Sequence, residues 1–211
     1  MHRMWVGRMN QTERLENYYK ELDFPQSVFI GDDDRFYGTW VMGNTYTVKS
    51  SYYGGYPHGY LKRIKALFPD KKNVLHLFSG QVDKEIFDGK TIDINPKNNP
   101  DVIGDAHNLS SYFNAEFDLV LSDPPYSIED CDHYGTSMVK RKTVLKECYK
   151  VLKKDGHIVW LDQVLPMYRK DELKVIGYIG MVKSTNHRFR VITIFEKLWK
   201  ARKELSDTNR T

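Results

Sequence analysis

An alternation of short apolar runs with helical segments over residues 59–197 is the feature that most constrains the fold of this chain. The runs are of β type and continuous in apolar residues, and the segments between them have helical spacing. Continuous apolar strands separated by helices predict a parallel sheet that is covered on both faces. The expected strands are residues 74–78, 91–94, 101–105, 117–123, 157–162, 173–180 and 189–196, and the expected helices are residues 59–68, 81–88, 108–114 and 136–153.

The last two expected strands are joined differently from the others. The stretch that separates them, MVKSTNHR, has no helical pattern and is typical of a turn. We therefore expect these two strands to form an antiparallel hairpin at the end of the sheet. The predicted fold is α/β, with a mostly parallel, doubly wound, Rossmann-like sheet of seven strands.

The N-terminal part of the chain has a different pattern. A polar helix is expected at residues 10–22, and a β-hairpin with its turn at Gly43-Asn44 is expected at residues 36–49. We expect this part to be an extension that is available for substrate contact. The predicted divisions are an N-terminal extension at residues 1–58, an α/β domain at residues 59–198 and a polar tail at residues 199–211.

Composition restricts the compartment and the class of partner. Of the 211 residues, 32 are Lys or Arg and 28 are Asp or Glu, a net charge of +4 that permits a polyanionic partner without demanding one. No apolar run approaches the roughly 20 residues that span a bilayer, and the N-terminus has no signal-peptide core, so a cytoplasmic protein without membrane contact is expected. Cys131 and Cys148 cannot staple a domain of this size, and no metal site is expected because they lack a further ligand pair.

The sequence Asp123-Pro124-Pro125-Tyr126 comes directly at the end of the strand expected at residues 117–123. Ligands of doubly wound sheets bind beyond the carboxyl ends of the strands, so this position is a candidate active site. An apolar strand that ends in Asp-Pro-Pro-Tyr resembles the DNA amino-methyltransferases, which transfer a methyl group from S-adenosylmethionine to an exocyclic amino group of a base. The resemblance covers most of the chain and implies the class I methyltransferase fold.

The residue types of this motif suit that chemistry. The lone pair of a base amino group is delocalised into the ring, which makes the nitrogen a poor nucleophile. Hydrogen bonds from the amino group to the carboxylate of Asp123 and the carbonyl of Pro124 let the nitrogen pyramidalise, and two prolines fix the backbone that presents these acceptors. Tyr126 offers a face on which a flipped base can stack. The expected catalytic residues are therefore Asp123, Pro124, Pro125 and Tyr126.

The resemblance also implies a binding site for S-adenosylmethionine at the ends of the first three strands. Phe78, Ser79 and Gly80 resemble a Phe-x-Gly motif, whose glycine lets the backbone approach the donor. Asp93 stands where an acidic residue holds the ribose hydroxyls, and Asp105 where a carboxylate accepts from the adenine amino group. The expected donor-binding residues are these five together with Tyr56, Pro57, Ile94, Ala106 and Asp123.

Target recognition has few candidate sources in this chain. The Phe-x-Gly segment precedes Asp-Pro-Pro-Tyr by 45 residues, which is the gamma-like motif order in a minimal form without an inserted recognition domain. We expect the base to contact Tyr126 and Ser127. The turn that holds His187 and Arg188 is expected to meet phosphates or to orient the base, and Arg190 has the same option.

The leading hypothesis is a methyltransferase that acts on N6 of adenine in DNA, with S-adenosylmethionine as its cofactor and DNA favoured over RNA as its partner. One alternative keeps the chemistry, because ribosomal and transfer RNA methyltransferases on adenine N6 or guanine N2 carry similar motifs. The other alternative is a catalytically silent methyltransferase fold that binds nucleic acid or supports an active partner. Its basis is that no second glycine follows Gly80 at the usual Gly-x-Gly spacing and that the first helix must be short.

Overall fold

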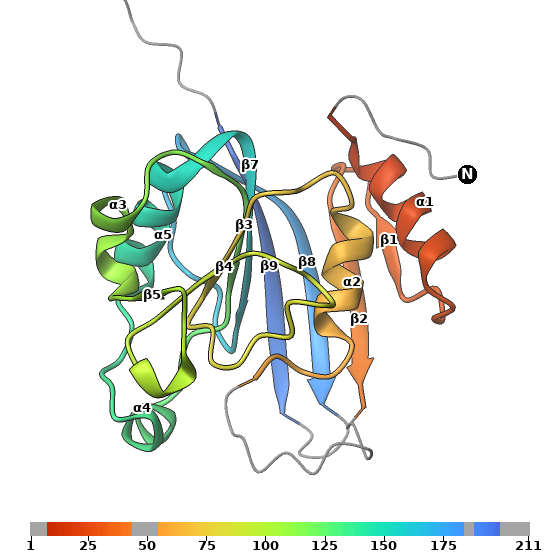
Figure 1. The fold of residues 1–211 in the computed structure, drawn as a ribbon. Coiled ribbons are helices and arrows are strands. Elements are labelled where there is room, and N and C mark those ends of the chain that lie inside the picture. Colours follow the sequence, from red (N-terminus) through yellow and green to blue (C-terminus); the bar gives the residue numbers. More distant parts are fainter. Residues whose placement is uncertain (1–7, 44–54, 184–187, 199–211) are drawn as a thin grey trace, which may run out of the picture.

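The computed structural model describes residues 8–43, 55–183 and 188–198, which form one mixed sheet with helices on both faces (Figure 1). Within these residues the sheet has nine strands in the order β1-β2-β8-β9-β7-β6-β3-β4-β5. The strands are β1 (Val28–Ile30), β2 (Phe36–Met42), β3 (Val74–Leu77), β4 (Lys90–Asp93), β5 (Val102–Ile103), β6 (Phe117–Ser122), β7 (Leu152–Asp162), β8 (Leu173–Lys183) and β9 (Phe189–Lys197). The helices are α1 (Gln11–Glu21), α2 (Tyr60–Leu67), α3 (Leu109–Tyr112), α4 (Ile128–Tyr134) and α5 (Arg141–Val151), with short 3-10 turns η1 (Pro96–Asn98) and η2 (Ala106–Asn108).

The strands from β3 to β9 confirm the predicted α/β sheet. In the order β5-β4-β3-β6-β7-β9-β8, neighbouring strands are parallel except where β9 pairs, antiparallel, with β7 and β8. Counted from β3 as the first strand, this order is 3-2-1-4-5-7-6, which is the arrangement of the class I methyltransferase fold. The carboxyl ends of β3, β4, β6 and β7 therefore lie at one edge of the sheet, where ligands of such folds bind.

The described part of the hairpin predicted at residues 36–49 is β2, which belongs to the main sheet. β2 pairs antiparallel with the preceding β1 and parallel with β8, so the sheet is two strands wider than predicted. Residues 44–49 of the expected hairpin lie outside the described residues. β2 buries Phe36, Trp40 and Met42 in the core, and the edge of β8 supplies its backbone partners.

Two hydrophobic clusters lie on opposite faces of the sheet. One cluster packs α1 and α2 against strand residues that include Leu121 and Val159. The other packs α3 and α5 against strand residues that include Val120 and Trp160. Since successive residues of a strand point to opposite faces, this division follows the alternation along β6 and β7.

The helices differ from the prediction in three places. No helix forms at residues 81–88, where the carboxylate of Asp83 accepts a hydrogen bond from the backbone N–H of Glu85 at 3.1 Å and closes a turn. α5 begins at Arg141 rather than at residue 136, and α4 follows the Pro-Pro-Tyr motif, where no helix was predicted. No helix within the described part of the chain combines the length and apolar content that crossing a membrane requires.

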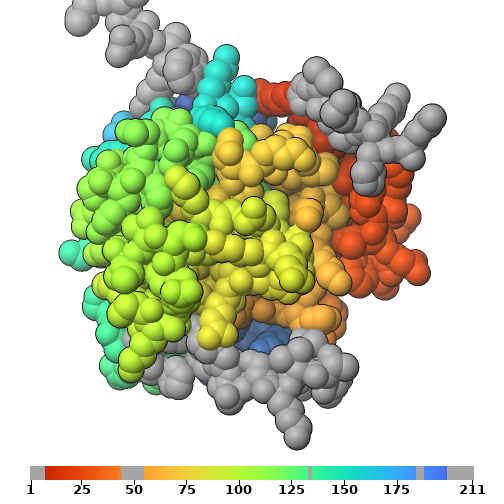
Figure 2. Space-filling model, in the orientation of Figure 1, coloured from red at the N-terminus to blue at the C-terminus, as the bar shows by residue number. Residues whose placement is uncertain are grey.

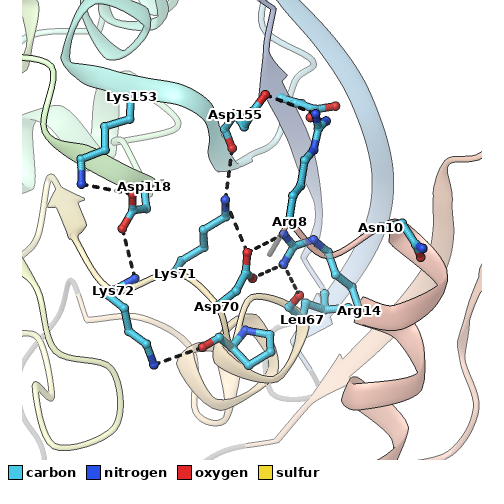
Figure 3. Close-up of polar contacts among 12 residues, drawn as sticks. Arg8, Asn10, Arg14, Leu67, Asp70, Lys71, Lys72, Asp118, Lys153 and Asp155 are labelled. Carbon is cyan, nitrogen blue, oxygen red and sulfur yellow. Dashed lines mark hydrogen bonds and ion pairs between the residues drawn. The ribbon is translucent and has the colours of Figure 1, made fainter. Parts of the chain in front are cut away.

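A buried ion pair fixes α1 to the end of α2 (Figure 3). The guanidinium of Arg14 donates to both carboxylate oxygens of Asp70, at 2.5 and 2.9 Å, and to the carbonyl of Leu67 at 3.1 Å. Lys71 lies 3.6 Å from Asp70 and donates to the carbonyl of Asp155 at 3.1 Å. These contacts anchor the C-terminal end of α2, whose opposite end reaches the edge of the sheet where the candidate site lies.

Candidate active site

The Asp-Pro-Pro-Tyr motif begins where β6 ends, near the middle of the carboxyl edge. Ser122, the last residue of β6, pairs with Leu77 of β3 on one side and with Trp160 of β7 on the other. Asp123 follows directly and is partly buried. The structure therefore places the predicted catalytic segment between the strands whose ends form the ligand site in this fold.

Asp123 and Tyr126 contact each other across the turn that the two prolines form. The hydroxyl of Tyr126 donates a hydrogen bond to Oδ1 of Asp123. The backbone N–H of Tyr126 donates to the carboxylate of Asp130, in α4, at 3.2 Å. The side chain of Ser127 accepts from the N–H of Asp130 at 3.2 Å and caps α4. Ser127, which was predicted to bind substrate, thus has a capping role in the structure.

The environment of Asp123 makes its carboxylate easier to protonate than usual. Burial raises the pKa of Asp123 to about 6, the positive charge of Arg190 and the hydrogen bond from Tyr126 oppose this rise, and Asp162 and Asp130 add to it. At neutral pH the side chain is therefore an ionised acceptor, with a proton affinity much closer to neutrality than that of an exposed aspartate.

Tyr56 and Tyr60 form a second part of the site. Their rings stack with centroids 5.3 Å apart, and both hydroxyls are buried without a hydrogen-bond partner in the described part of the chain. Burial raises the pKa of both hydroxyls well above the usual value, and the charge of Asp123 adds to each rise. Tyr56 and the buried Pro57 were predicted to bind the donor, whereas Tyr60, the first residue of α2, was missed.

The segment after β3 contacts the end of β4. Phe78 and Gly80 have positive φ angles of 54° and 50°, a conformation that favours glycine at position 80. The backbone N–H of Gly80 donates to Asp93 at 2.9 Å. The hydroxyl of Ser79 is buried and has no partner among the described residues.

The carboxylate of Asp93 is held by its own chain as well. Besides Gly80, it accepts from the backbone N–H of Asn95 at 2.8 Å and from the side-chain amide of Asn98 at 3.0 Å. Ile94, the residue that follows, is 56% exposed and available to a ligand. Asp93 is thus positioned by backbone and amide donors at the end of β4.

Next to this carboxylate lies a pocket of about 480 Å³. Its lining includes Gly80 and Asn98, which both contact Asp93, together with Lys84 and Asp101, whose side chains form an ion pair at 2.7 Å. Figure 2 shows that the connections after β3 and β4, in yellow and yellow-green, cover the front of the molecule in this orientation. Gln81, Lys97 and Asn99, which also line the pocket, are exposed, so the pocket is open to solvent.

Asp105 has taken a capping role at the end of β5. Its carboxylate accepts from the backbone N–H of His107 at 2.9 Å and from Nδ1 of the same ring at 2.6 Å. Because Nε2 of His107 accepts from the N–H of Lys140 at 3.0 Å, the ring is the neutral Nδ1–H tautomer. Partial burial acts to raise the pKa of Asp105, but the hydrogen bonds from His107 outweigh it and leave that pKa below the usual value. The adjacent Ala106 is buried.

Arg190 and Asp162 are site residues that the sequence did not clearly indicate. The guanidinium of Arg190, in β9, lies 4.4 Å from the centroid of the Tyr126 ring. Asp162, at the end of β7, is fully buried and accepts a hydrogen bond from Arg141. Of the predicted turn residues, Arg188 is exposed and His187 lies outside the described residues.

No protein-family model and no curated protein matches the sequence. Among solved structures, the N-methyltransferase NodS from Bradyrhizobium japonicum WM9, crystallised with S-adenosyl-l-homocysteine, is similar over 67% of this chain and 86% of its own, at 13% identity and a TM-score of 0.47. An rRNA methylase from Streptococcus thermophilus is similar over 61% of this chain and 88% of its own, at 9% identity and a TM-score of 0.39. Neither similarity assigns a ligand or a reaction to this chain.

Proposed function

We propose that this chain is an S-adenosylmethionine-dependent methyltransferase that methylates an exocyclic amino group of a nucleic-acid base, with N6 of adenine in DNA as the preferred target. The observation that carries the proposal is the position of Asp123-Pro124-Pro125-Tyr126 at the carboxyl end of β6, between β3 and β7. In this place an ionised acceptor, a rigid carbonyl and an aromatic face converge on the ligand side of the sheet.

The residues at the ends of β3 to β5 fit the donor. Buried hydroxyls without partners at Ser79 and Tyr56 offer hydrogen bonds, and Gly80 keeps the backbone free of a side chain beside Asp93. When bound, the donor supplies an electrophilic methyl group on a sulfonium. The residues that would hold it are Tyr56, Pro57, Phe78, Ser79, Gly80, Asp93, Ile94, Asp105 and Ala106.

The motif residues act on the amino group of the base. Asp123 accepts a hydrogen bond from the amino group, and the carbonyl of Pro124 accepts the second, which orients the nitrogen lone pair. The hydroxyl of Tyr126 uses Oδ1 of Asp123 in the structure, so Oδ2 is the oxygen that accepts from the amino group. With a pKa of about 6, Asp123 is also able to take up the proton that the amino group loses after methylation.

Nucleoside mass spectrometry tests this proposal directly. The purified protein is incubated with S-adenosylmethionine and, in separate reactions, with unmethylated DNA and unmethylated RNA, with Asp123→Ala as the matched control. N6-methyldeoxyadenosine made by the wild type alone supports the proposal. N6-methyladenosine or N2-methylguanosine from RNA alone would assign the alternative substrate, and no methylated nucleoside from either polymer would overturn the enzyme assignment.

A specific observation favours a second candidate, a silent fold that binds nucleic acid or supports a partner. The connection between β3 and β4 forms no α-helix in the structure, and no second glycine follows Gly80 at the usual spacing. Calorimetric titration with S-adenosylmethionine separates the two candidates. Absence of binding at millimolar donor would support the silent fold, and binding would leave the enzyme as the better assignment.

A further inference from the structure

Arg190 contacts the Asp-Pro-Pro-Tyr motif from a strand that lies far from it in the sequence. It is the second residue of β9, and its guanidinium stacks on the ring of Tyr126 at cation–π distance, 4.4 Å from the centroid. The hydroxyl of the same tyrosine donates to Asp123. A continuous series of contacts thus runs from β9 through Tyr126 to the carboxylate at the end of β6.

The Nε–H group of Arg190 is buried and has no hydrogen-bond partner within the described part of the chain. A buried donor without a partner has lost its hydrogen bonds to water, which destabilises the folded protein. A bound ligand that accepts a hydrogen bond from this donor removes the desolvation penalty. This unused donor therefore marks a ligand contact beside Tyr126 and Asp123.

We propose that Arg190 is a positioning and specificity residue of this site, which holds the Tyr126 ring beside Asp123 and donates through Nε–H to the ring nitrogen adjacent to the amino group that is methylated. The inference rests on the proposed function and deepens it, because it names the feature of the base that is read.

A donor beside an acceptor selects one class of amine. In adenine and in cytosine, the carbon that bears the amino group also bears a ring nitrogen with a free lone pair. Asp123 accepts from the amino group, and Arg190 donates to this ring nitrogen. An aliphatic amine has no such acceptor, and a site built to pair both groups rejects an analogue that lacks one of them.

The charge of Arg190 acts on the same carboxylate. Burial raises the pKa of Asp123, and Arg190 opposes that rise. Removal of the charge is therefore expected to raise the pKa of Asp123 further. The groups that act on Asp123 or feel its charge are Arg190 of β9, Asp162 of β7, Asp130 of α4, Tyr126, Tyr60 and Tyr56.

The first test needs no activity. The protein is labelled with ¹³C-aspartate, the Asp123 carboxyl signal is assigned with Asp123→Asn, and its titration is followed in the wild type, Arg190→Met and Arg190→Lys. We expect the Asp123 pKa to rise by about 1 unit in Arg190→Met and by less in Arg190→Lys. Lys174→Met, which removes an exposed charge from the adjacent β8, is the matched control and should leave the titration unchanged. Equal titrations in the wild type and Arg190→Met would overturn the positioning role.

The second test addresses the base. kcat/KM is measured on a DNA oligonucleotide with adenine and on the same oligonucleotide with 1-deazaadenine, in which the ring nitrogen next to the amino group is replaced by C–H. The wild type should lose roughly tenfold on the analogue, as expected for one hydrogen bond from a charged donor. Arg190→Met should be slower on adenine and should no longer distinguish the two substrates.

The outcomes separate the inference from the proposed function. If Arg190→Met discriminates against 1-deazaadenine as strongly as the wild type does, base reading by Arg190 is wrong although the enzyme assignment stands. If the wild type methylates no nucleic acid, base reading falls with the proposed function. The aspartate titration then still decides, by itself, whether Arg190 positions Tyr126 and Asp123.

Discussion

Arg141 donates two hydrogen bonds to Asp162, from Nε to Oδ2 at 2.6 Å and from Nη2 to Oδ1 at 3.1 Å. The carboxylate is fully buried at the end of β7, and the indole N–H of Trp160 also donates to it, at 3.0 Å. The first residue of α5 is thereby tied to the strand beside the candidate active site. Arg141 is thus a structural partner of β7.

Removal of Arg141 should destabilise the fold. Arg141→Met leaves the carboxylate of Asp162 buried without its cation, and breaking one side of such a pair costs roughly 3–5 kcal/mol. Urea unfolding followed by circular dichroism measures the change. Lys142→Met, which removes an exposed charge from the next position of α5, is the control and should change little. Equal midpoints for the two variants would show that Arg141 contributes nothing special.

The ion pair between Arg14 of α1 and Asp70, which follows α2, should make the stability of the fold depend on pH in the acid range. Burial acts to raise the pKa of Asp70, but Arg14 and Lys71 outweigh it, so that pKa is lower in the folded chain than its usual value of 3.8. A lowered folded-state pKa contributes stability above pH 3.8 that is lost as the pH falls through the folded value. Asp70→Asn should therefore be less stable than the wild type at pH 7, with a gap that closes below about pH 4.

Urea midpoints at pH 7, 5 and 3 test the Asp70 prediction. Asp171→Asn, at the exposed pair of Arg169 and Asp171, is the control because both of those side chains are more than half exposed. A gap between the wild type and Asp70→Asn that stayed constant with pH would argue that the loss is one of packing.

Asp123 should have the opposite effect on stability. Its folded-state pKa of about 6 lies above the usual 3.8, so its contribution is fully present below pH 3.8 and is lost as the pH rises through about 6. Asp123→Asn, which can still accept from Tyr126, should therefore be more stable than the wild type at pH 8 by roughly 1–2 kcal/mol and equal to it near pH 3. Thermal unfolding at both pH values measures this, and a stabilisation that is the same at pH 3 and pH 8 would contradict it.

The rate of methyl transfer should follow the same ionisation. Because the proposed acceptor is the carboxylate form of Asp123, kcat/KM should rise about tenfold per pH unit below pH 6 and become constant above it. A steady-state pH profile measures this limb. In Tyr126→Phe the carboxylate loses a hydrogen-bond donor, so the limb should move to higher pH while the aromatic face is kept. If the limb stays at the same pH in that variant, the pH dependence does not arise from the ionisation of Asp123.

Donor affinity should depend on Asp93. Asp93→Asn retains the shape of the side chain but loses the charge that is proposed to hold the ribose. We therefore expect the dissociation constant for S-adenosylmethionine, measured by calorimetry, to be 10- to 100-fold higher in this variant. Glu85→Gln, in the exposed part of the preceding connection, removes one negative charge without touching Asp93 and serves as the control. Equal affinities for the two variants would exclude Asp93 from the donor site.

The sequence predicted those parts of the fold that depend on local pattern. The strands of the α/β sheet were found because their apolar runs are continuous, and the antiparallel pairing of β8 with β9 was found because the sequence between them has no helical pattern. The pairing of β2 with β8 was not found, because it depends on which edge of the sheet remains open after the rest has folded. The helix expected at residues 81–88 was replaced by a turn, since the side chain of Asp83 competes for the backbone donors that a helix would use.

The site was predictable to a similar extent. The positions of Asp123, Tyr126, Gly80 and Asp93 near the carboxyl ends of strands could be predicted because each lies at the end of an apolar run or shortly after it in the sequence. Arg190 was only one option among neighbouring residues, because its contact with Tyr126 depends on β9 lying on the opposite side of β7 from β6. When a side chain reaches a site from a strand that is not adjacent to the site's own strand, its distance along the sequence from the site residues follows no recognisable spacing.

The parallel pairing of β2 with β8 has a consequence for the order of events during synthesis. Phe36 of β2 pairs with Gly177 of β8, so the ribosome synthesises β2 long before it synthesises the strand with which β2 pairs. Contacts between residues so far apart close a long loop and form late. Until then Trp40 and Phe36, which are fully buried in the finished sheet, have no strand to cover them. Until β8 has been made, this segment exposes apolar side chains of the kind that make folding intermediates prone to aggregation.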